Sequence, residues 1–283
     1  MKKLLIALSS LILFGCTRTG LELANLPAKF SDTDIIQNVS YGEEPWQKLD
    51  IYIPKHSPED TLPVVVFFYG GSWQDGSKDM YPFVGEGFAQ HNYITVIADY
   101  SKYPQVVFPR FVDDGAKAVA WTYRNIANYS GNPDNLFISG HSAGAHIAGL
   151  ITADQRYLQK EGLNTSIIKA FAGMSGPYDF VPREEIYKAI FGPEKNYPEM
   201  QVTTFIEGNE PPMLLLWGAD DTLVGQSNMD LLASKIRQQH GQVTTKIYPN
   251  VDHVGMVSSF TWFFRGKAPV LEDICQFFSQ HSS

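Results

Sequence analysis

The chain has 283 residues, of which 44% are hydrophobic and 18% charged, so it is long enough to bury a large core as one α/β domain. Its formal net charge is −8, and without a basic stripe to neutralise phosphates, nucleic acid is not an expected partner. No low-complexity tract or internal repeat divides the chain, so we expect no interdomain linker.

The N-terminus differs from the rest. Two lysines are followed by an apolar run at residues 4–14, which is too short to span a membrane as a mature helix, and then by Gly15 and Cys16. This start resembles a bacterial lipoprotein signal at residues 1–15. The resemblance implies cleavage before Cys16, acylation of Cys16, and export to the bacterial cell envelope with a lipid anchor in a membrane. Residues 16–34 would then form a tether. The alternative, an ordinary secretory signal with an incidental cysteine, also exports the protein.

The second cysteine, Cys275, would remain as a free thiol, because one cysteine cannot form an internal disulfide. It falls in the apolar pattern of the last predicted helix, residues 271–280. A buried structural thiol is therefore expected rather than a catalytic one.

Apolar alternation, helical spacing and turn residues predict strands alternating with helices through most of the chain. The run at 63–68 is continuously apolar and β-branched, as in a strand covered on both faces. The expected strands are 35–39, 48–53, 63–68, 93–98, 136–139, 167–174, 213–217 and 243–248, with helices at 83–90, from Pro109, and at 143–151, 227–240 and 271–280. The first two strands should pair antiparallel. The remainder predicts an α/β fold with a mostly parallel sheet flanked by helices.

The motif Gly140-x-Ser142-x-Gly144 lies between the strand at 136–139 and the helix at 143–151. Such a motif can arise by chance, but here the required strand and helix flank it. Glycines remove the Cβ atoms that would clash where strand turns into helix. The turn would place the Ser142 hydroxyl at the positive end of the helix, beside the free amide of Ala143. Ser142 is therefore predicted to be a nucleophile.

A second glycine cluster, Tyr69-Gly70-Gly71-Ser72-Trp73, follows the strand at 63–68. Backbone amides of a glycine turn can approach the oxygen that becomes negative during acyl transfer. The cluster resembles the H-G-G-x-W loop of carboxylesterases. By that match, the amides of Gly71 and Ser72 would join that of Ala143 in an oxyanion hole. Tyr69 stands where these enzymes often have histidine, and we expect it to supply the hydrogen bonds that order the loop.

The loop from Asp99 to Pro104 resembles the D-Y-R-x-x-P loop of the same esterases. Asp99 is a candidate catalytic acid, but it precedes Ser142, whereas the order in this fold is serine, acid, histidine. We expect it to hold the loop backbone instead.

Three other polar residues are interpreted as structural. Asp113 and Asp114 sit in the first turn of the helix that begins at Pro109, where carboxylates suit the helix dipole. His146 lies one turn after Ser142, and a side chain on the same helix points along the axis rather than across to the hydroxyl. A core or pocket histidine is expected there.

The predicted acid and base follow the last two strands. In the resembling family the acid occupies a G-x-x-D-x-x-V turn, and that register selects Asp221 over Asp220. His253 follows the strand at 243–248, a position from which a base can reach Ser142. Together Ser142, Asp221 and His253 have the order of a catalytic triad.

With these motifs, residues 35–283 resemble the α/β-hydrolase superfamily. Within it they resemble carboxylesterases of the hormone-sensitive-lipase, prenylcysteine-methylesterase and kynurenine-formamidase type. The resemblance implies an α/β-hydrolase domain with a small cap insertion at about residues 180–211. It also implies a serine hydrolase that cleaves small carboxylic esters through an acyl-enzyme on Ser142, with no metal or organic cofactor.

Two alternatives stay open. The same three residues would serve an amidase or formamidase, because esters and amides react through the same kind of intermediate. A non-catalytic binding protein displayed on the cell surface could also use this fold. The sequence does not identify the physiological substrate, the acyl chain length, the oligomeric state, or whether the inner or outer membrane is used.

Overall fold

The computed structural model describes residue 25 and residues 32–57 and 60–282. The predicted signal, Cys16 and most of the 16–34 tether lie outside these residues. In the described part of the chain, the helices are all too short or too polar to cross a bilayer.

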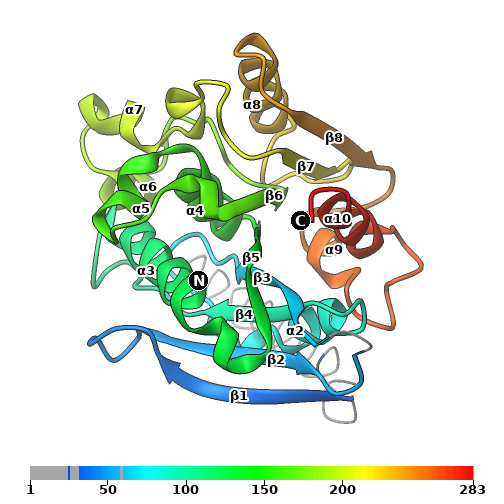
Figure 1. Cartoon of the computed structure of the whole chain (residues 1–283). Coiled ribbons are helices and arrows are strands. Elements are labelled where there is room, and N and C mark those ends of the chain that lie inside the picture. The colour runs from blue at the N-terminus through cyan, green and yellow to red at the C-terminus, as the bar shows by residue number, and fades with distance from the viewer. Residues whose placement is uncertain (1–24, 26–31, 58–59, 283) are drawn as a thin grey trace, which may run out of the picture.

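Eight strands form one sheet in the order β1-β2-β4-β3-β5-β6-β7-β8 (Figure 1). The strands are β1 (Thr33–Ser40), β2 (Lys48–Pro54), β3 (Leu62–Phe68), β4 (Ile94–Ala98), β5 (Gly131–His141), β6 (Ile168–Met174), β7 (Met213–Gly218) and β8 (Val243–Tyr248). Antiparallel pairing joins β1 to β2 and β2 to β4. All other neighbours are parallel, so the predicted mostly parallel sheet is confirmed.

Helices cover both faces of the sheet. The described α-helices are α2 (Pro82–Ala89), α3 (Arg110–Asn125), α4 (Ala143–Ala153), α5 (Gln155–Lys160), α6 (Glu185–Phe191), α7 (Tyr197–Met200), α8 (Ser227–Gln238), α9 (His253–Ser258) and α10 (Val270–Ser279). Figure 1 shows α3 and α4 together on one face and α2 and α10 together on the other. All five residues of β4 are consequently buried, each large aliphatic side chain contributing about 1.5–3 kcal/mol.

Several predicted boundaries were wrong. The strand before the nucleophile begins at Gly131, where a turn was expected, because Leu62 of β3 extends the ladder by pairing with Gly131. This added stretch is polar and carries no apolar alternation for a pattern to detect. The strand β1 begins at Thr33, inside the predicted tether. The short helices α5 and α9 were not predicted, nor was the 3₁₀ turn at Lys78–Met80.

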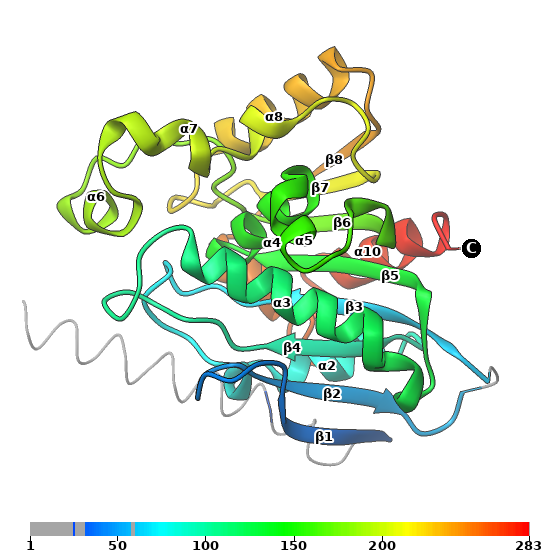
Figure 2. The ribbon, with the colours of Figure 1, turned by 60° about the vertical axis from the view of Figure 1, so that its left-hand side comes forward.

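The segment predicted as a cap contains α6 and α7, which Figure 2 shows projecting beyond the ends of the strands. Two of the contacts that tie it to the main body are polar and come from different elements. The amide of Phe108 donates to the carbonyl of Ile190 (2.9 Å). Arg156 of α5 pairs with Glu199 of α7 at 2.7 Å.

Candidate active site

Ser142 lies at a sharp turn between β5 and α4, with φ 56° and ψ −126°. The flanking glycines make that turn possible. A Cβ on Gly140 would lie 2.6 Å from the backbone of Gly144, and a Cβ on Gly144 would lie 2.1 Å from the carbonyl oxygen of Phe68. The predicted strained turn and the predicted need for two glycines are therefore both confirmed.

Asp221 and His253 meet directly. The Asp221 Oδ2 atom lies 2.8 Å from His253 Nδ1, and Asp221 Oδ1 accepts the amides of Leu223 and Val224, each at 2.9 Å. Burial raises the pKa of Asp221, but the hydrogen bonds from His253 and Val224 outweigh it and bring the pKa to about 2. An ionised carboxylate of this kind holds Nδ1 of the imidazole protonated. Asp220 is exposed, which fits its exclusion from the pair.

His141 links this pair to the nucleophile. Its Nε2 donates to the carbonyl oxygen of His253 at 2.9 Å, and the two imidazole centroids are 4.7 Å apart. Burial and the neighbouring His253 lower the pKa of His141 to about 3, so its ring is neutral near pH 7. Because His141 immediately precedes Ser142, this contact ties the backbone of His253 to the residue before the nucleophile. Sequence reasoning assigned no role to His141, and its only signal was its place inside the glycine motif.

The predicted oxyanion loop packs on the nucleophile. A Cβ on Gly70 would lie 3.0 Å from Ser142 Cβ. The next residues take positive φ angles, 135° at Gly71 and 52° at Ser72. Among the described residues, no loop or turn carbonyl accepts the amide of Gly71, Ser72 or Ala143. Ala143 is the first residue of α4, where a helix leaves its amide without an internal partner.

Tyr69 and Asp99 form the support beneath that loop. The Tyr69 hydroxyl donates to Asp99 Oδ1 at 2.6 Å and accepts from Lys102 Nζ at 2.9 Å. The same carboxylate oxygen accepts the amide of Lys78 at 2.9 Å. The prediction that Tyr69 supplies loop-ordering hydrogen bonds is confirmed. Asp99 does hold a backbone amide rather than the imidazole, but it is the amide of Lys78 and not one of its own loop.

His146 is a core histidine, as predicted. It is fully buried, its Nε2 donates to the carbonyl of Met200 at 2.7 Å, and its ring stands edge-on to Trp73 with centroids 5.3 Å apart. Burial lowers the pKa of His146 to about 4. The side chain therefore joins α4 to α7 rather than serving Ser142.

Asp113 and Asp114 also have structural contacts. Asp114 is buried and accepts hydrogen bonds from Trp46 Nε1 and Gln47 Nε2. Asp113 pairs with Lys160 at 2.6 Å.

Cys275 is buried in α10, and burial raises the pKa of its thiol, as expected of a structural cysteine.

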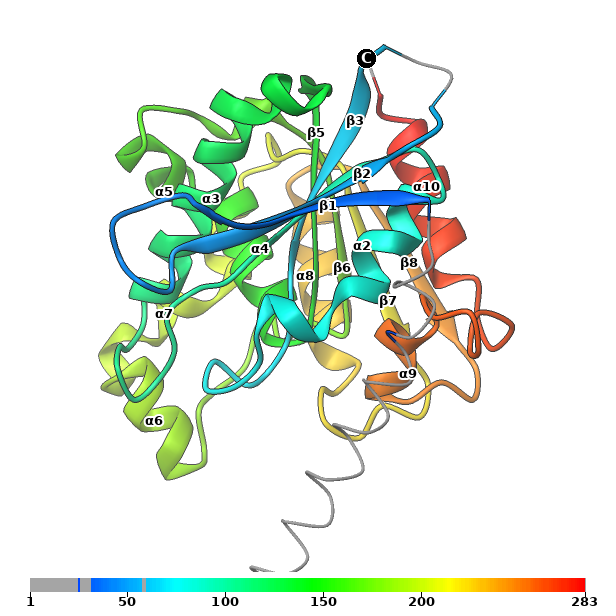
Figure 3. The ribbon, with the colours of Figure 1, turned by 90° about the horizontal axis from the view of Figure 1, so that it is seen from below.

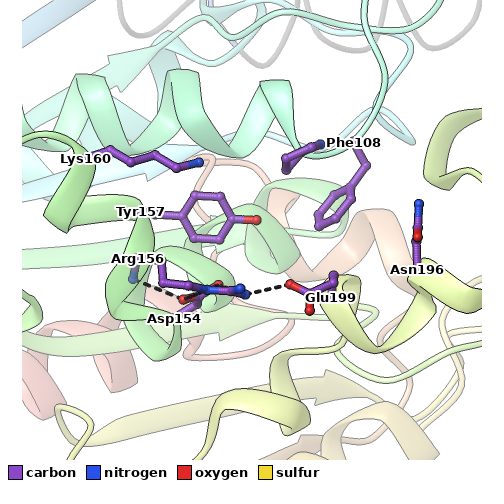
Figure 4. A pocket seen from close by; sticks show the side chains of 8 residues that line it. Phe108, Asp154, Arg156, Tyr157, Lys160, Asn196 and Glu199 are labelled. Atoms are coloured by element: carbon purple, nitrogen blue, oxygen red, sulfur yellow. Dashed lines mark hydrogen bonds and ion pairs between the residues drawn. The ribbon is translucent and has the colours of Figure 1, made fainter.

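A cavity of about 360 Å³ lies under the cap, away from Ser142, Asp221 and His253 (Figure 4). Its lining residues are Phe108, Pro109, Asp154, Arg156, Tyr157, Lys160, Asn196 and Glu199. Arg156 pairs with both Asp154 and Glu199. This cavity therefore holds a largely solvent-exposed ion-pair network between α5 and α7. In the described ranges no group of three or more histidine, cysteine or acidic residues is placed to bind a metal ion.

A glycine-flanked serine after β5, a carboxylate after β7 and a histidine after β8, on an eight-stranded mostly parallel sheet, define an α/β-hydrolase. Solved structures agree on the fold. A tributyrin-phosphonate-inhibited esterase B from Lactobacillus rhamnosis superimposes with a TM-score of 0.79 at 18% identity, covering 95% of each chain. A truncated carbohydrate esterase from gut microbiota has a TM-score of 0.76 at 17% identity, covering 88% of this chain and 96% of that one.

Residues 49–236 match the BD-FAE family, and the chain belongs to that family. A probable isoprenylcysteine alpha-carbonyl methylesterase of Oryza sativa is 28% identical over 79% of this chain and 59% of its own length. Esterase LipC of Mycobacterium tuberculosis is 28% identical over 72% and 57%. This chain thus spans little more than half the length of these relatives.

Proposed function

We propose that this protein is a serine hydrolase that cleaves small carboxylic esters through an acyl-enzyme on Ser142. The observation that carries the proposal is the 2.8 Å contact between Asp221 and His253, together with the hydrogen bond from His141, the residue before Ser142, to the His253 carbonyl. The relatives named as methylesterase and esterase support the same class of reaction.

In the first step, the Ser142 oxygen attacks the ester carbonyl carbon while His253 Nε2 takes the hydroxyl proton. Asp221 holds the tautomer that leaves Nε2 free to act as the base. The amides of Gly71, Ser72 and Ala143 stabilise the negative carbonyl oxygen. The intermediate then collapses, its bond to the alcohol oxygen breaks, and His253 returns the proton to the departing alcohol.

In the second step, water replaces the alcohol. His253 takes a proton from the water as the water oxygen attacks the acyl carbon. When the bond to Ser142 breaks, the proton passes to the serine oxygen and the carboxylic acid is released. The enzyme returns to its starting state without any external reagent.

The test is Ser142→Ala, assayed with p-nitrophenyl acetate and butyrate. Turnover should fall by at least about 10³-fold, because the nucleophile is lost. Ser139→Ala is the matched control, since it removes a hydroxyl from the same strand that donates to Ala172 and should keep its turnover. Undiminished hydrolysis by Ser142→Ala would remove the proposal. Labelling by a fluorophosphonate probe separates the enzyme from a non-catalytic binding protein, which would not react.

Formamidase action is the second candidate. A kynurenine formamidase of Danio rerio is 34% identical over 54% of this chain and 49% of its own length. The loop residue Trp73 is packed against Phe180 and Phe191 of the cap region, which favours a small acyl group near the nucleophile. Comparing p-nitrophenyl acetate with formanilide distinguishes the two, because only a formamidase would turn over the anilide efficiently.

We also propose that the chain is exported and anchored through acylated Cys16, as its N-terminal sequence indicates. Mass spectrometry of the protein from bacterial membranes tests this idea. A lipid mass on an N-terminal Cys16, absent in Cys16→Ser, would support it. An unmodified chain released into the soluble envelope fraction would leave the ordinary secretory signal as the explanation.

A further inference from the structure

The connection between α9 and α10 exposes three consecutive large aromatic side chains. Trp262 is 70% exposed, Phe263 58% and Phe264 43%. The Trp262 and Phe263 rings pack on each other, with centroids 4.9 Å apart, and so form one projecting apolar surface. We call residues 262–264 the aromatic segment. Figures 1 and 3 show this connection in orange-red, projecting at the edge of the molecule beyond α9 and α10. Contiguous exposed apolar surface of this kind marks an interaction site.

The stretch of sequence around the aromatic segment is basic, whereas the whole chain is acidic; one acidic residue of another element, Glu86 of α2, lines the hollow that Trp262 and Arg265 share. The chain carries −8 overall, but between Asp252 and Glu272 it contains Arg265 and Lys267 and no acidic residue. Lys267 Nζ lies over the Phe264 ring, 5.0 Å from its centroid. Exposed tryptophan and phenylalanine beside basic side chains are the combination that anionic membrane interfaces attract.

One described residue of the N-terminal region, Asn25, lies next to this surface. The Asn25 side chain donates to the carbonyl of Met80 (3.2 Å) and accepts the amide of Phe83 (3.0 Å). Phe83 in turn lines a small hollow of about 90 Å³ together with Trp262 and Arg265. Asn25 therefore contacts the folded domain on the side that presents the aromatic segment.

We propose that the aromatic segment docks into the interface of an anionic lipid bilayer. The partner is the lipid surface itself: the rings of Trp262 and Phe263 enter the headgroup region, and Lys267 faces anionic phosphates. Because His253 opens α9, the helix that leads into this connection, docking would place the candidate active site close to the membrane surface. The inference depends on exposed surface and charge, and it stands independently of the catalytic proposal.

The experiment uses the full chain with vesicles of brominated phosphatidylcholine and phosphatidylglycerol, whose bromine atoms quench tryptophan fluorescence on contact. The chain has five tryptophans, so the signal of Trp262 is the difference between wild type and Trp262→Phe. We expect most of the quenching to disappear in Trp262→Phe. The double variant Trp262→Phe/Leu231→Trp is the matched control, because Leu231 is an exposed apolar residue of α8, and its tryptophan should escape quenching.

Equal quenching in wild type and Trp262→Phe, or no quenching in either, would overturn docking by this segment. The second outcome would also result if the N-terminal segment covered the aromatic rings instead of lipid. The basic component has its own readout. Titration with vesicles, followed by the quenching of Trp262, should give a higher vesicle affinity with phosphatidylglycerol than without it. Lys267→Gln should reduce the affinity for the phosphatidylglycerol vesicles about fivefold. An unchanged affinity of Lys267→Gln for these vesicles would contradict a role for charge.

Discussion

The two sides of the candidate site are held in place by different physical means. Ser142 is positioned by backbone packing, because Gly140 and Gly144 let strand, helix and the end of β3 approach closer than any Cβ would allow. Asp221 and His253 are positioned by hydrogen bonds to Leu223, Val224 and His141. The nucleophile side should therefore tolerate almost no change in shape. The acid and base side should tolerate changes that keep donors and acceptors in place.

The largest effect is expected from Gly144→Ala. Its new Cβ would lie 2.1 Å from the Phe68 carbonyl oxygen and 2.4 Å from that of Tyr69, and neither backbone atom can move without displacing β3. We expect ester turnover to fall at least about 10³-fold and unfolding free energy to drop by several kcal/mol. Turnover assays and urea titration measure the two effects.

Gly149→Ala is the control for that variant. It lies on the same helix, but its Cβ would meet only side-chain atoms, Val202 Cγ2 at 3.2 Å and the Tyr178 ring at 3.5 Å. Stability should change by less than about 1 kcal/mol. If Gly149→Ala lost as much turnover and unfolding free energy as Gly144→Ala, the cause would be a general effect on the helix rather than the close packing of the Ser142 turn.

The second-largest effect is expected from Asp221→Asn, which tests the part of the site that is positioned by hydrogen bonds. The amide would offer an N–H where His253 Nδ1–H needs an acceptor, so the imidazole would favour the wrong tautomer. We expect kcat to fall by about 10³-fold with little change in KM. The neighbouring Asp220→Asn should have near wild-type kcat because Asp220 is exposed. The opposite ranking of these two variants would assign the acid to the other carboxylate.

His141→Ala should have a smaller effect. It removes the donor to the His253 carbonyl, so kcat should drop about tenfold while substrate binding is retained. His141→Gln keeps an N–H donor at similar reach and should recover most of that loss. Equal kcat values for the alanine and glutamine variants would mean that His141 fills space rather than positions His253.

The same division explains what the sequence could predict. Where a local backbone conformation requires particular residues, such as glycine, the sequence contains a motif that can be recognised. The Ser142 turn, the Gly71 loop and most strands were predicted for this reason. The choice of Asp221 over Asp220 depended on the register of a known turn. Contacts between distant segments leave no local pattern, which is why the donation from His141 to His253 was not predicted. The polar start of β5 was missed for the same reason, since only its pairing with Leu62 makes it a strand.

The smallest effect on catalysis, and a separate effect on stability, is expected from His146→Phe. His146 lies on α4, the helix whose start is fixed by backbone packing, but its side chain is held by a hydrogen bond to the Met200 carbonyl. Its pKa in the folded state is about 4, below the ordinary value of about 6.5. As pH falls from 6.5 towards 4, the unfolded chain takes up a proton that the folded chain does not, and stability is lost.

Phenylalanine fits the same aromatic surroundings and does not titrate. Between pH 7 and pH 5 the wild type should therefore lose about 2 kcal/mol more unfolding free energy than His146→Phe. Urea titrations of both proteins at the two pH values measure this difference, whatever the absolute cost of leaving the Met200 carbonyl unpaired. Equal losses would mean that His146 is protonated within the folded protein, and that the contact between α4 and the cap opens in acid.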